Sequence, residues 1–173
     1  MKKYELTEET FTVFGKTLYR IRAVRDFGSV KTGEFGGYIE KEENLSHFGD
    51  AWVYGNAKVY GNAKVSGDAK VYGNAKVYGD ARVSGNAWVY GNAEVFNTRH
   101  FFVQGPIGSR DGYVTFYRTK DDTVEVRCGC FSGSLQEFVN QVEETHGGSR
   151  YEKEYKLAAE LAKVCIRLEG ESR

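Results

Sequence analysis

The sequence has little proline, little cysteine and no net charge, and each of these features excludes a class of protein. Its 173 residues contain one proline and three cysteines, and 24 Lys and Arg balance 24 Asp and Glu. Three cysteines cannot all pair within one chain, so we expect a reducing, cytoplasmic location rather than a secreted disulfide scaffold. A formal net charge of zero gives no overall field toward nucleic acid or anionic lipid, and we expect neither as a partner.

Long apolar runs are also missing. No stretch of about eighteen apolar residues occurs, and no apolar segment follows the basic start of the chain, so we expect neither a membrane span nor a secretion signal. The chain does contain 21 glycines and 14% aromatic residues. Glycine without proline is not typical of a disordered linker and indicates many tight, regular turns.

The middle of the chain repeats the six-residue unit V-[YS]-G-[ND]-A-x. Valine recurs every six residues from Val53 to Val95, and alanine follows each valine by four positions until the last. This period is not helical, because apolar positions at i, i+4 and i+6 drift around an α-helix. It suits a very short strand and a corner, with valine and alanine inside and Gly-Asn or Gly-Asp at the turn. Such units bury their apolar side only by stacking, which predicts a parallel β-helix.

The residue after each valine predicts the number of faces. It is aromatic except at Ser66 and Ser84, which lie eighteen residues apart. Three hexads per coil therefore give two aromatic faces and one serine face, which we expect Trp52, Lys70 and Trp88 to flank. Two different aromatic faces suit a threefold ring, so we expect a homotrimer. The predicted interface residues are Tyr54, Tyr60, Tyr72, Tyr78, Tyr90 and Phe96.

These residues resemble the hexapeptide-repeat, left-handed β-helix proteins, and most closely their YdcK-like, phage-borne branch. The lead-in "VKTGEFGGYIEKEENLSHFGDAWVYGNA" carries the same resemblance. The tail "GPIGSRDGYVTFYRTKDDTVEVRCGCFSGSLQEF", with "THGG", is similar to a small domain of unknown role that is common in phage proteins. The resemblance implies a left-handed coil and a trimer.

Three segments follow from this pattern: an N-terminal cap and lead-in coil (1–46), a hexapeptide β-helix (47–98) and a C-terminal α+β domain (99–173). We expect a hairpin around Gly15 in the cap, and His47 in an inward valine position. In the last segment, a capping box predicts a helix that starts after Ser134 and ends at Gly147. A second helix is expected from about Tyr151. Its predicted apolar face consists of Tyr155, Ala158, Leu161, Ala162, Cys165 and Leu168.

The segment "GPIGSRDG" is the predicted ligand site. Glycines, a serine hydroxyl and an arginine can form a backbone nest that suits phosphate or carboxylate. The alternative is a glycine-rich connection whose arginine pairs with an acid such as Asp111. The candidate ligand-binding residues are Gly105, Gly108, Ser109 and Arg110, with Arg118 and Arg127 on the following strands.

The sequence gives weaker indications of a metal site or a nucleic-acid site. We expect Cys128, Cys130 and Cys165 to pack in the core, because C-x-C with His146 lacks the spacing and the fourth ligand of a zinc site. We therefore expect no metal and no cofactor. Lys58, Lys64, Lys70, Lys76 and Arg82 form basic rows that can bind single-stranded nucleic acid, but more often such rows are a solvated face.

Three classes of function stay open. The first is a non-catalytic, homotrimeric, phage-type protein that sequesters a small anionic or nucleotide-like ligand at intersubunit clefts. The second is a CoA-dependent acyltransferase of the kind that the repeat resembles, which uses a histidine as general base. His100 is its best candidate, although the long loop that closes over the acyl donor is missing. The third is a structural module that trimerises its end domains.

Overall fold

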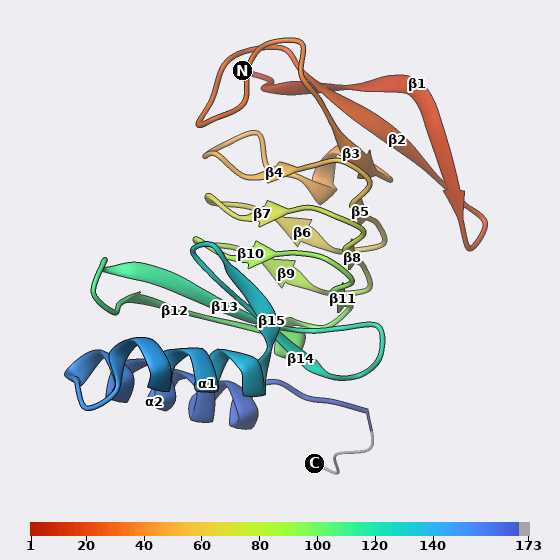
Figure 1. The fold of residues 1–173 in the computed structure, drawn as a ribbon. Coiled ribbons are helices and arrows are strands. Elements are labelled where there is room, and N and C mark those ends of the chain that lie inside the picture. The colour runs from red at the N-terminus through yellow and green to blue at the C-terminus, as the bar shows by residue number, and fades with distance from the viewer. Residues whose placement is uncertain (170–173) are drawn as a thin grey trace. The chain divides into compact units, whose positions relative to one another are not determined.

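The computed structural model describes residues 1–169 and divides into two compact units. The β-helix unit comprises Met1–Thr98, and the C-terminal unit comprises Arg99–Arg173. Figure 1 shows the stacked coils of the first unit and the sheet and two helices of the second. No helix within residues 1–169 is long and apolar enough to cross a bilayer.

The repeat forms the predicted three-sided parallel β-helix. Residues eighteen apart pair in register, as in Val53↔Val71, and the paired strands stack into three faces. The first face consists of β4 (Trp52–Val53), β7 (Lys70–Val71) and β10 (Trp88–Val89). The second consists of β5 (Lys58–Val59), β8 (Lys76–Val77) and β11 (Glu94–Val95). The third consists of β6 (Lys64–Val65) and β9 (Arg82–Val83).

Burial and backbone bonding both follow the six-residue unit. The repeat valines and alanines are buried, and each short strand bonds to the next coil, as from Tyr72 N to Val89 O at 3.0 Å. The corners need glycine for two reasons. Gly67 has a φ of 67°, and a Cβ there would lie 2.9 Å from the Gly85 backbone nitrogen of the next coil. A side chain at this corner would therefore be strained and would force the coils apart.

The N-terminal cap continues one face of the coil. The predicted hairpin is β1 (Tyr4–Val13) and β2 (Lys16–Ala23), and β2 pairs with β3 (Phe35–Ile39). Since β3 also pairs in parallel with β5, cap and coil form one sheet in the order β1-β2-β3-β5-β8-β11. The hairpin thus covers a strand edge that the first coil would otherwise expose.

The lead-in coil is two residues longer than the later coils. Ile39 pairs with Val59 and Leu45 bridges to Val65, so in both pairs the partners are twenty residues apart rather than eighteen. The 3₁₀ turn η1 (Glu42–Asn44) lies between Ile39 and Leu45. Leu45 therefore fills the inward position that we predicted for His47. The His47 ring instead stacks on Tyr4, with ring centroids 4.3 Å apart.

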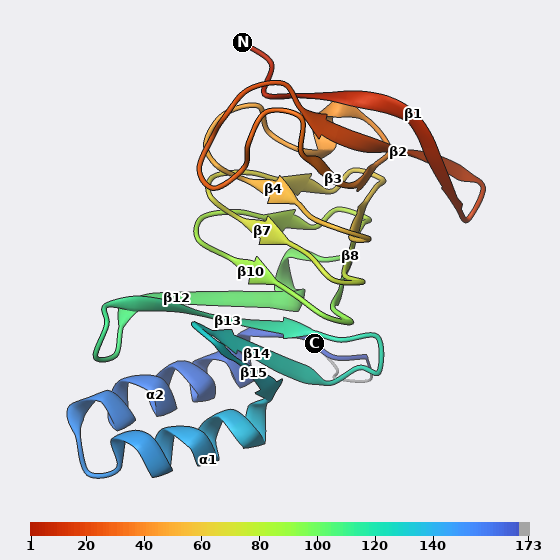
Figure 2. The ribbon, with the colours of Figure 1, turned by 45° about the horizontal axis from the view of Figure 1, so that its top comes forward.

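The C-terminal unit is an antiparallel sheet with two helices on one face (Figure 2). After the 3₁₀ turn η2 (Thr98–His100), its strands run in sequence order: β12 (Phe101–Ile107), β13 (Gly112–Arg118), β14 (Val124–Cys128) and β15 (Phe131–Ser134). The helices are α1 (Leu135–His146) and α2 (Arg150–Cys165). Its core consists of Val114, Phe116, Val126, Phe138, Val142, Ala158, Ala159, Ala162 and Ile166.

The helix predictions hold at the start of α1 and in part on the face of α2. Ser134 and Glu137 form the predicted capping box: Glu137 N donates to Ser134 Oγ at 3.2 Å, and the Glu137 carboxylate accepts from Ser134 N at 2.7 Å. Helix α2 buries Ala158, Ala159 and Ala162, whereas Leu161 is 47% exposed. Tyr155 and Leu168 pack against the same core as predicted, and Cys165 is half-buried, so Leu161 is the departure from the predicted face.

Candidate functional site

The aromatic residues after the valines stack into two ladders. Tyr54, Tyr72 and Tyr90 form the first, with neighbouring ring centroids 5.9 and 4.7 Å apart in edge-to-face geometry. In the second ladder, Tyr60 and Tyr78 stack with centroids 5.0 Å apart, and Phe96 follows at 5.2 Å from Tyr78. The stacking follows the eighteen-residue spacing of the sequence. The role of these rings in a trimer interface stays a prediction.

One predicted interface residue is not available to a partner. Tyr60 is only 3% exposed, and this burial raises the pKa of its hydroxyl to about 12. The other five ladder residues are half-buried. In the second ladder, therefore, only Tyr78 and Phe96 are exposed enough to contact a partner subunit.

The tryptophans belong to an aromatic face and not to the serine face. Trp52, Lys70 and Trp88 start β4, β7 and β10, so they share strands with the Tyr54 ladder. The residue after each alanine is therefore the first strand residue of the next face. We had instead expected these three residues to lie beside the serines. Lys70 Nζ lies 5.1 Å from the Trp88 ring centroid, and Trp88 also contacts Tyr72 edge to face. This face is thus the most aromatic of the three.

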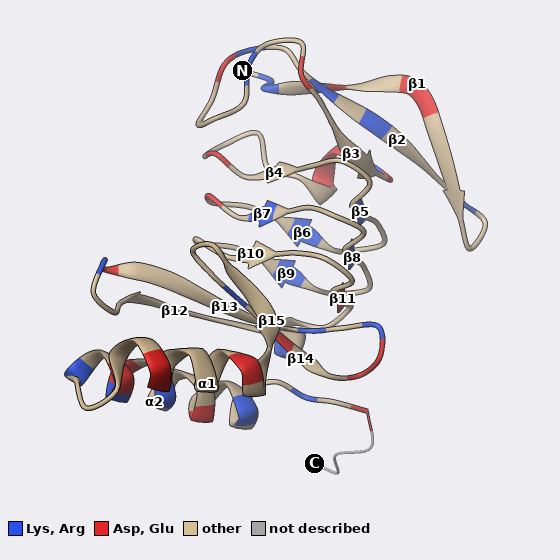
Figure 3. Cartoon of the chain, viewed as in Figure 1, with Lys and Arg blue, Asp and Glu red and all other residues tan. Residues whose placement is uncertain are grey.

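The basic residues of the repeat are divided among the faces and do not form one continuous row. Figure 3 shows them on separate strands. Lys70 lies between the two tryptophans, and Lys76 Nζ lies 3.9 Å from the Glu94 carboxylate in the next coil. Two faces carry a pair of basic residues in successive coils, Lys58 with Lys76 and Lys64 with Arg82.

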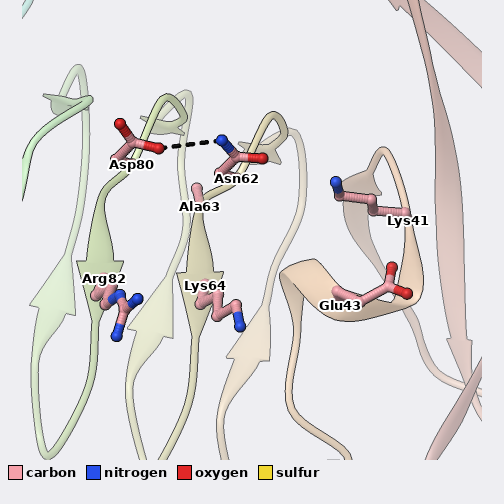
Figure 4. Close-up of a pocket in the computed structure, with 7 residues that line it drawn as sticks. All are labelled: Lys41, Glu43, Asn62, Ala63, Lys64, Asp80 and Arg82. Atoms are coloured by element: carbon pink, nitrogen blue, oxygen red, sulfur yellow. Dashed lines mark hydrogen bonds between the residues drawn. The ribbon is translucent and has the colours of Figure 1, made fainter.

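A polar groove lies on the third face, the one without aromatic residues (Figure 4). Its volume is about 510 Å³. Asn62 Nδ2 donates to Asp80 Oδ1 at 3.1 Å across two coils, next to the paired Lys64 and Arg82 of β6 and β9. The lining residues are Lys41, Glu43, Asn62, Ala63, Lys64, Asp80 and Arg82.

Sequence reasoning missed this groove for a definable reason. The eighteen-residue spacing places Lys64 beside Arg82 and Asn62 beside Asp80, so four of the seven lining residues could have been found. Lys41 and Glu43 come from the longer lead-in coil, whose register the repeat does not predict. The groove combines three cationic side chains with the carboxylates of Glu43 and Asp80, which suits a ligand that carries both an anionic group and donor groups.

The predicted ligand loop contacts its own chain. Gly108 N donates to the Glu154 carboxylate of α2 at 2.7 Å. A Cβ at Gly108, where φ is 75°, would overlap the Tyr155 hydroxyl. One N–H of the loop therefore binds a carboxylate of the same chain. An external anion would have to displace Glu154.

The six candidate residues do not form one cluster. Gly105 lies within β12, whereas Gly108, Ser109 and Arg110 lie in the β12–β13 connection. Arg127 lies in β14 toward the same end of the sheet, where it pairs with Thr115. Arg118 lies at the opposite end of β13. It is 4% exposed and pairs with Asp122 at 2.7 Å and Glu169 at 3.2 Å. The expectation that Arg118 adds charge to the loop is therefore wrong.

The cysteines also differ from expectation. Cys130 is exposed in the turn between β14 and β15, whereas Cys128 and Cys165 are half-buried. Burial raises the pKa of Cys128, although a hydrogen bond with Tyr155 opposes this shift. Within the described residues, no group of three or more His, Cys, Asp or Glu side chains is arranged to hold a metal ion.

The best candidate for a catalytic base is a buried histidine. Burial, followed by the charge of Arg118, lowers the pKa of His100 to about 4. An effective general base has a pKa near the working pH. His100 is thus a poor proton acceptor at neutral pH, and the acyltransferase interpretation loses its strongest residue.

Comparison with known proteins agrees with the coil. A family model described as YdcK Beta solenoid repeat matches residues 75–91. No curated protein matches the chain. The match and the stacked coils together define a hexapeptide-repeat β-solenoid, of the kind found in left-handed β-helix proteins. Its repeat is of the YdcK type.

Proposed function

We propose that this protein is a non-catalytic, homotrimeric binding protein that holds a small anionic, nucleotide-like ligand, in keeping with the phage-borne proteins that its sequence resembles. The groove on the third face carries the proposal. Its volume of about 510 Å³ lies within the usual range of small-molecule sites. Lys41, Lys64 and Arg82 supply positive charge, and the Asn62–Asp80 pair supplies acceptors for ligand N–H or O–H groups.

The proposed trimer uses the two aromatic faces. In a threefold ring, one face of each subunit meets a different face of its neighbour. The Tyr54 ladder and the Tyr78–Phe96 pair provide two such faces. This arrangement leaves the third face, and therefore the groove, accessible to ligand.

Thermal stabilisation tests the ligand. Purified protein is heated with a panel of nucleoside mono-, di- and triphosphates and cyclic dinucleotides while unfolding is followed by tryptophan fluorescence. A ligand at a hundredfold excess over its Kd should stabilise the protein by about 2.7 kcal/mol. The proposal fails if no member of this panel raises the unfolding temperature.

Two matched substitutions locate the ligand. Arg82→Gln should abolish the stabilisation, because it removes a groove cation. Arg110→Gln should leave the stabilisation intact, because Arg110 belongs to the loop that Glu154 already contacts. The opposite pattern would assign the ligand to the loop.

Light scattering tests the trimer. The wild-type mass should be three times the chain mass of 19.5 kDa. Tyr72→Glu combined with Tyr78→Glu places a charge in each aromatic face and should yield monomers. Ser66→Glu combined with Ser84→Glu is the control on the third face and should stay trimeric. A trimer in both variants would rule out the aromatic interface.

A protein-interaction role is the second candidate, and α2 favours it. Leu157, Leu161 and Val164 form an outward apolar stripe at helical spacing, and their exposed fractions are 70%, 47% and 82%. Leu157→Gln combined with Val164→Gln should preserve helix content and abolish capture of a partner that the wild-type protein retains. Equal capture by the variant would exclude α2 as the contact.

A further inference from the structure

Two thiols flank a single glycine at the turn between β14 and β15. Cys128 ends β14 and Cys130 precedes β15, while Gly129 adopts a φ of 56°. Val114 pairs with Cys128, so this turn lies at the same end of the sheet as the Gly108 loop. Neither the ligand groove nor the proposed trimer uses these residues.

The backbone brings the two cysteines within bonding range. Residues two positions apart are separated by at most about 7 Å between Cα atoms, and a tight turn shortens this distance. A disulfide needs a Cα separation of about 4.4–6.8 Å. Glycine between the cysteines accepts the left-handed conformation of the turn without strain. The turn therefore allows a Cα separation within this range.

The surroundings give the two thiols different roles. Cys130 is exposed to soluble reagents, whereas Cys128 is half-buried and hydrogen-bonded with the Tyr155 side chain. Arg127 Nη1 lies 3.5 Å from the Cys130 carbonyl oxygen, which places a guanidinium beside the turn. The thiolate is the reactive form of cysteine, and Cys130 is the thiol that a soluble reagent reaches first.

We propose that Cys128 and Cys130 are a thiol–disulfide exchange site that reacts with small-molecule disulfides and closes a reversible bond across Gly129. The Cys130 thiolate attacks a disulfide RSSR, which forms Cys130–S–S–R and releases one RS⁻. The Cys128 thiolate then attacks the Cys130 sulfur and releases the second RS⁻. The two protons lost by the protein convert both RS⁻ to RSH, so the protein loses two electrons and RSSR gains two.

Bond formation should also change the contacts of Tyr155. This tyrosine connects the two halves of the site, because its hydroxyl lies against Gly108 and its side chain bonds with Cys128. A disulfide sulfur has no S–H to donate and is a weak hydrogen-bond acceptor. The oxidised form should therefore weaken the hydrogen bond between Cys128 and Tyr155.

Peptide mass spectrometry tests the exchange directly. Full-length protein is equilibrated with oxidised and reduced glutathione, quenched in acid and digested with trypsin. Cleavage after Arg127 and Arg150 yields one peptide, residues 128–150, that contains both cysteines and excludes Cys165. We expect this peptide to be about 2 Da lighter than its reduced form and to resist alkylation until a reductant is added. A peptide that carries only glutathione adducts, or stays reduced under oxidising conditions, overturns the proposal.

Variants separate the two steps. Cys128→Ser should trap glutathione on Cys130, Cys130→Ser should abolish the internal bond, and Cys165→Ser should behave like wild type. Tyr155→Phe should slow ring closure about fivefold, since it removes a hydrogen bond that stabilises the Cys128 thiolate. A persistent internal bond in Cys130→Ser, through Cys165, would assign the chemistry to another pair.

Discussion

The two units of this chain build their cores in opposite ways. The β-helix unit repeats small residues at fixed positions, so Val53, Val71 and Val89 occupy equivalent places in successive coils. The C-terminal unit has one irregular cluster around Phe116 and Phe138, whose ring centroids lie 5.8 Å apart. The effect of a substitution in the first unit therefore depends on register. In the second unit it depends on a few large neighbours.

Spectroscopy can follow the two units separately. The chain has two tryptophans, Trp52 and Trp88, and both lie in the β-helix unit. The α-helices of the described chain, α1 and α2, both lie in the C-terminal unit. Tryptophan fluorescence thus reports on the coil, and helix circular dichroism reports on the second unit. The following predictions use this separation.

The largest expected effect is in the aromatic cluster. Phe116→Ala removes a fully buried ring and should destabilise the C-terminal unit by about 3–5 kcal/mol. Urea unfolding followed by helix circular dichroism measures this loss. Unfolding followed by tryptophan fluorescence should change much less. Equal shifts of both signals would show that the two cores unfold as one.

A matched pair of glycines tests the register of the coil. Gly67 and Gly85 both have positive φ, but only at Gly67 would a Cβ meet the backbone of another coil. Gly67→Ala and Gly85→Ala should each cost about 1–2 kcal/mol for the left-handed conformation. Gly67→Ala should cost about 1–3 kcal/mol more, because it overpacks the coil interface. Fluorescence-detected unfolding measures both, and equal losses would contradict the tight stacking.

The buried histidine makes the second unit sensitive to acid. His100 has a folded-state pKa of about 4 against an ordinary value of 6.5. Between these values the unfolded chain binds the proton and the folded chain does not, so stability falls as the pH decreases. The expected loss between pH 7 and pH 5 is about 2 kcal/mol. His100→Gln should flatten this dependence in helix-detected unfolding; an unchanged slope would assign it to other groups.

The smallest effect is expected at the start of α1. Ser134→Ala removes the hydroxyl that accepts from Glu137 N and should cost about 1 kcal/mol in helix-detected unfolding. Ser132→Ala, in the neighbouring strand β15, is the control and should change stability less. A larger loss at Ser132 than at Ser134 would contradict the cap.

The β-helix was predictable because its information is local and repeated. Each valine, glycine and alanine occupies an equivalent position in every coil. The spacing of Ser66 and Ser84 shows that a face recurs every eighteen residues. Prediction failed where the period changes. His47 lost its inward position to Leu45 because the lead-in coil is two residues longer, and that same irregular segment provides Lys41 and Glu43 of the groove.

The second unit was predictable in its elements but less so in its side-chain positions. The strands expected to carry Arg118 and Arg127 are β13 and β14, and the capping box predicted the start of α1. The strand that carries Arg118 already separates it from Arg110, but the sequence could not show that Cys130 lies in a turn. Such placements depend on where strands end and how helices pack, and these are properties of the whole unit.

The eighteen-residue coil also sets a rule for how this protein can change in length. Inserting or deleting a complete coil would keep every ladder on its own face and would change the height by about 4.8 Å, one strand spacing. Inserting a single hexad would instead shift every later residue to the next face and place serines where tyrosines had stacked. Length in this architecture is therefore quantised, and natural variants should differ by whole coils.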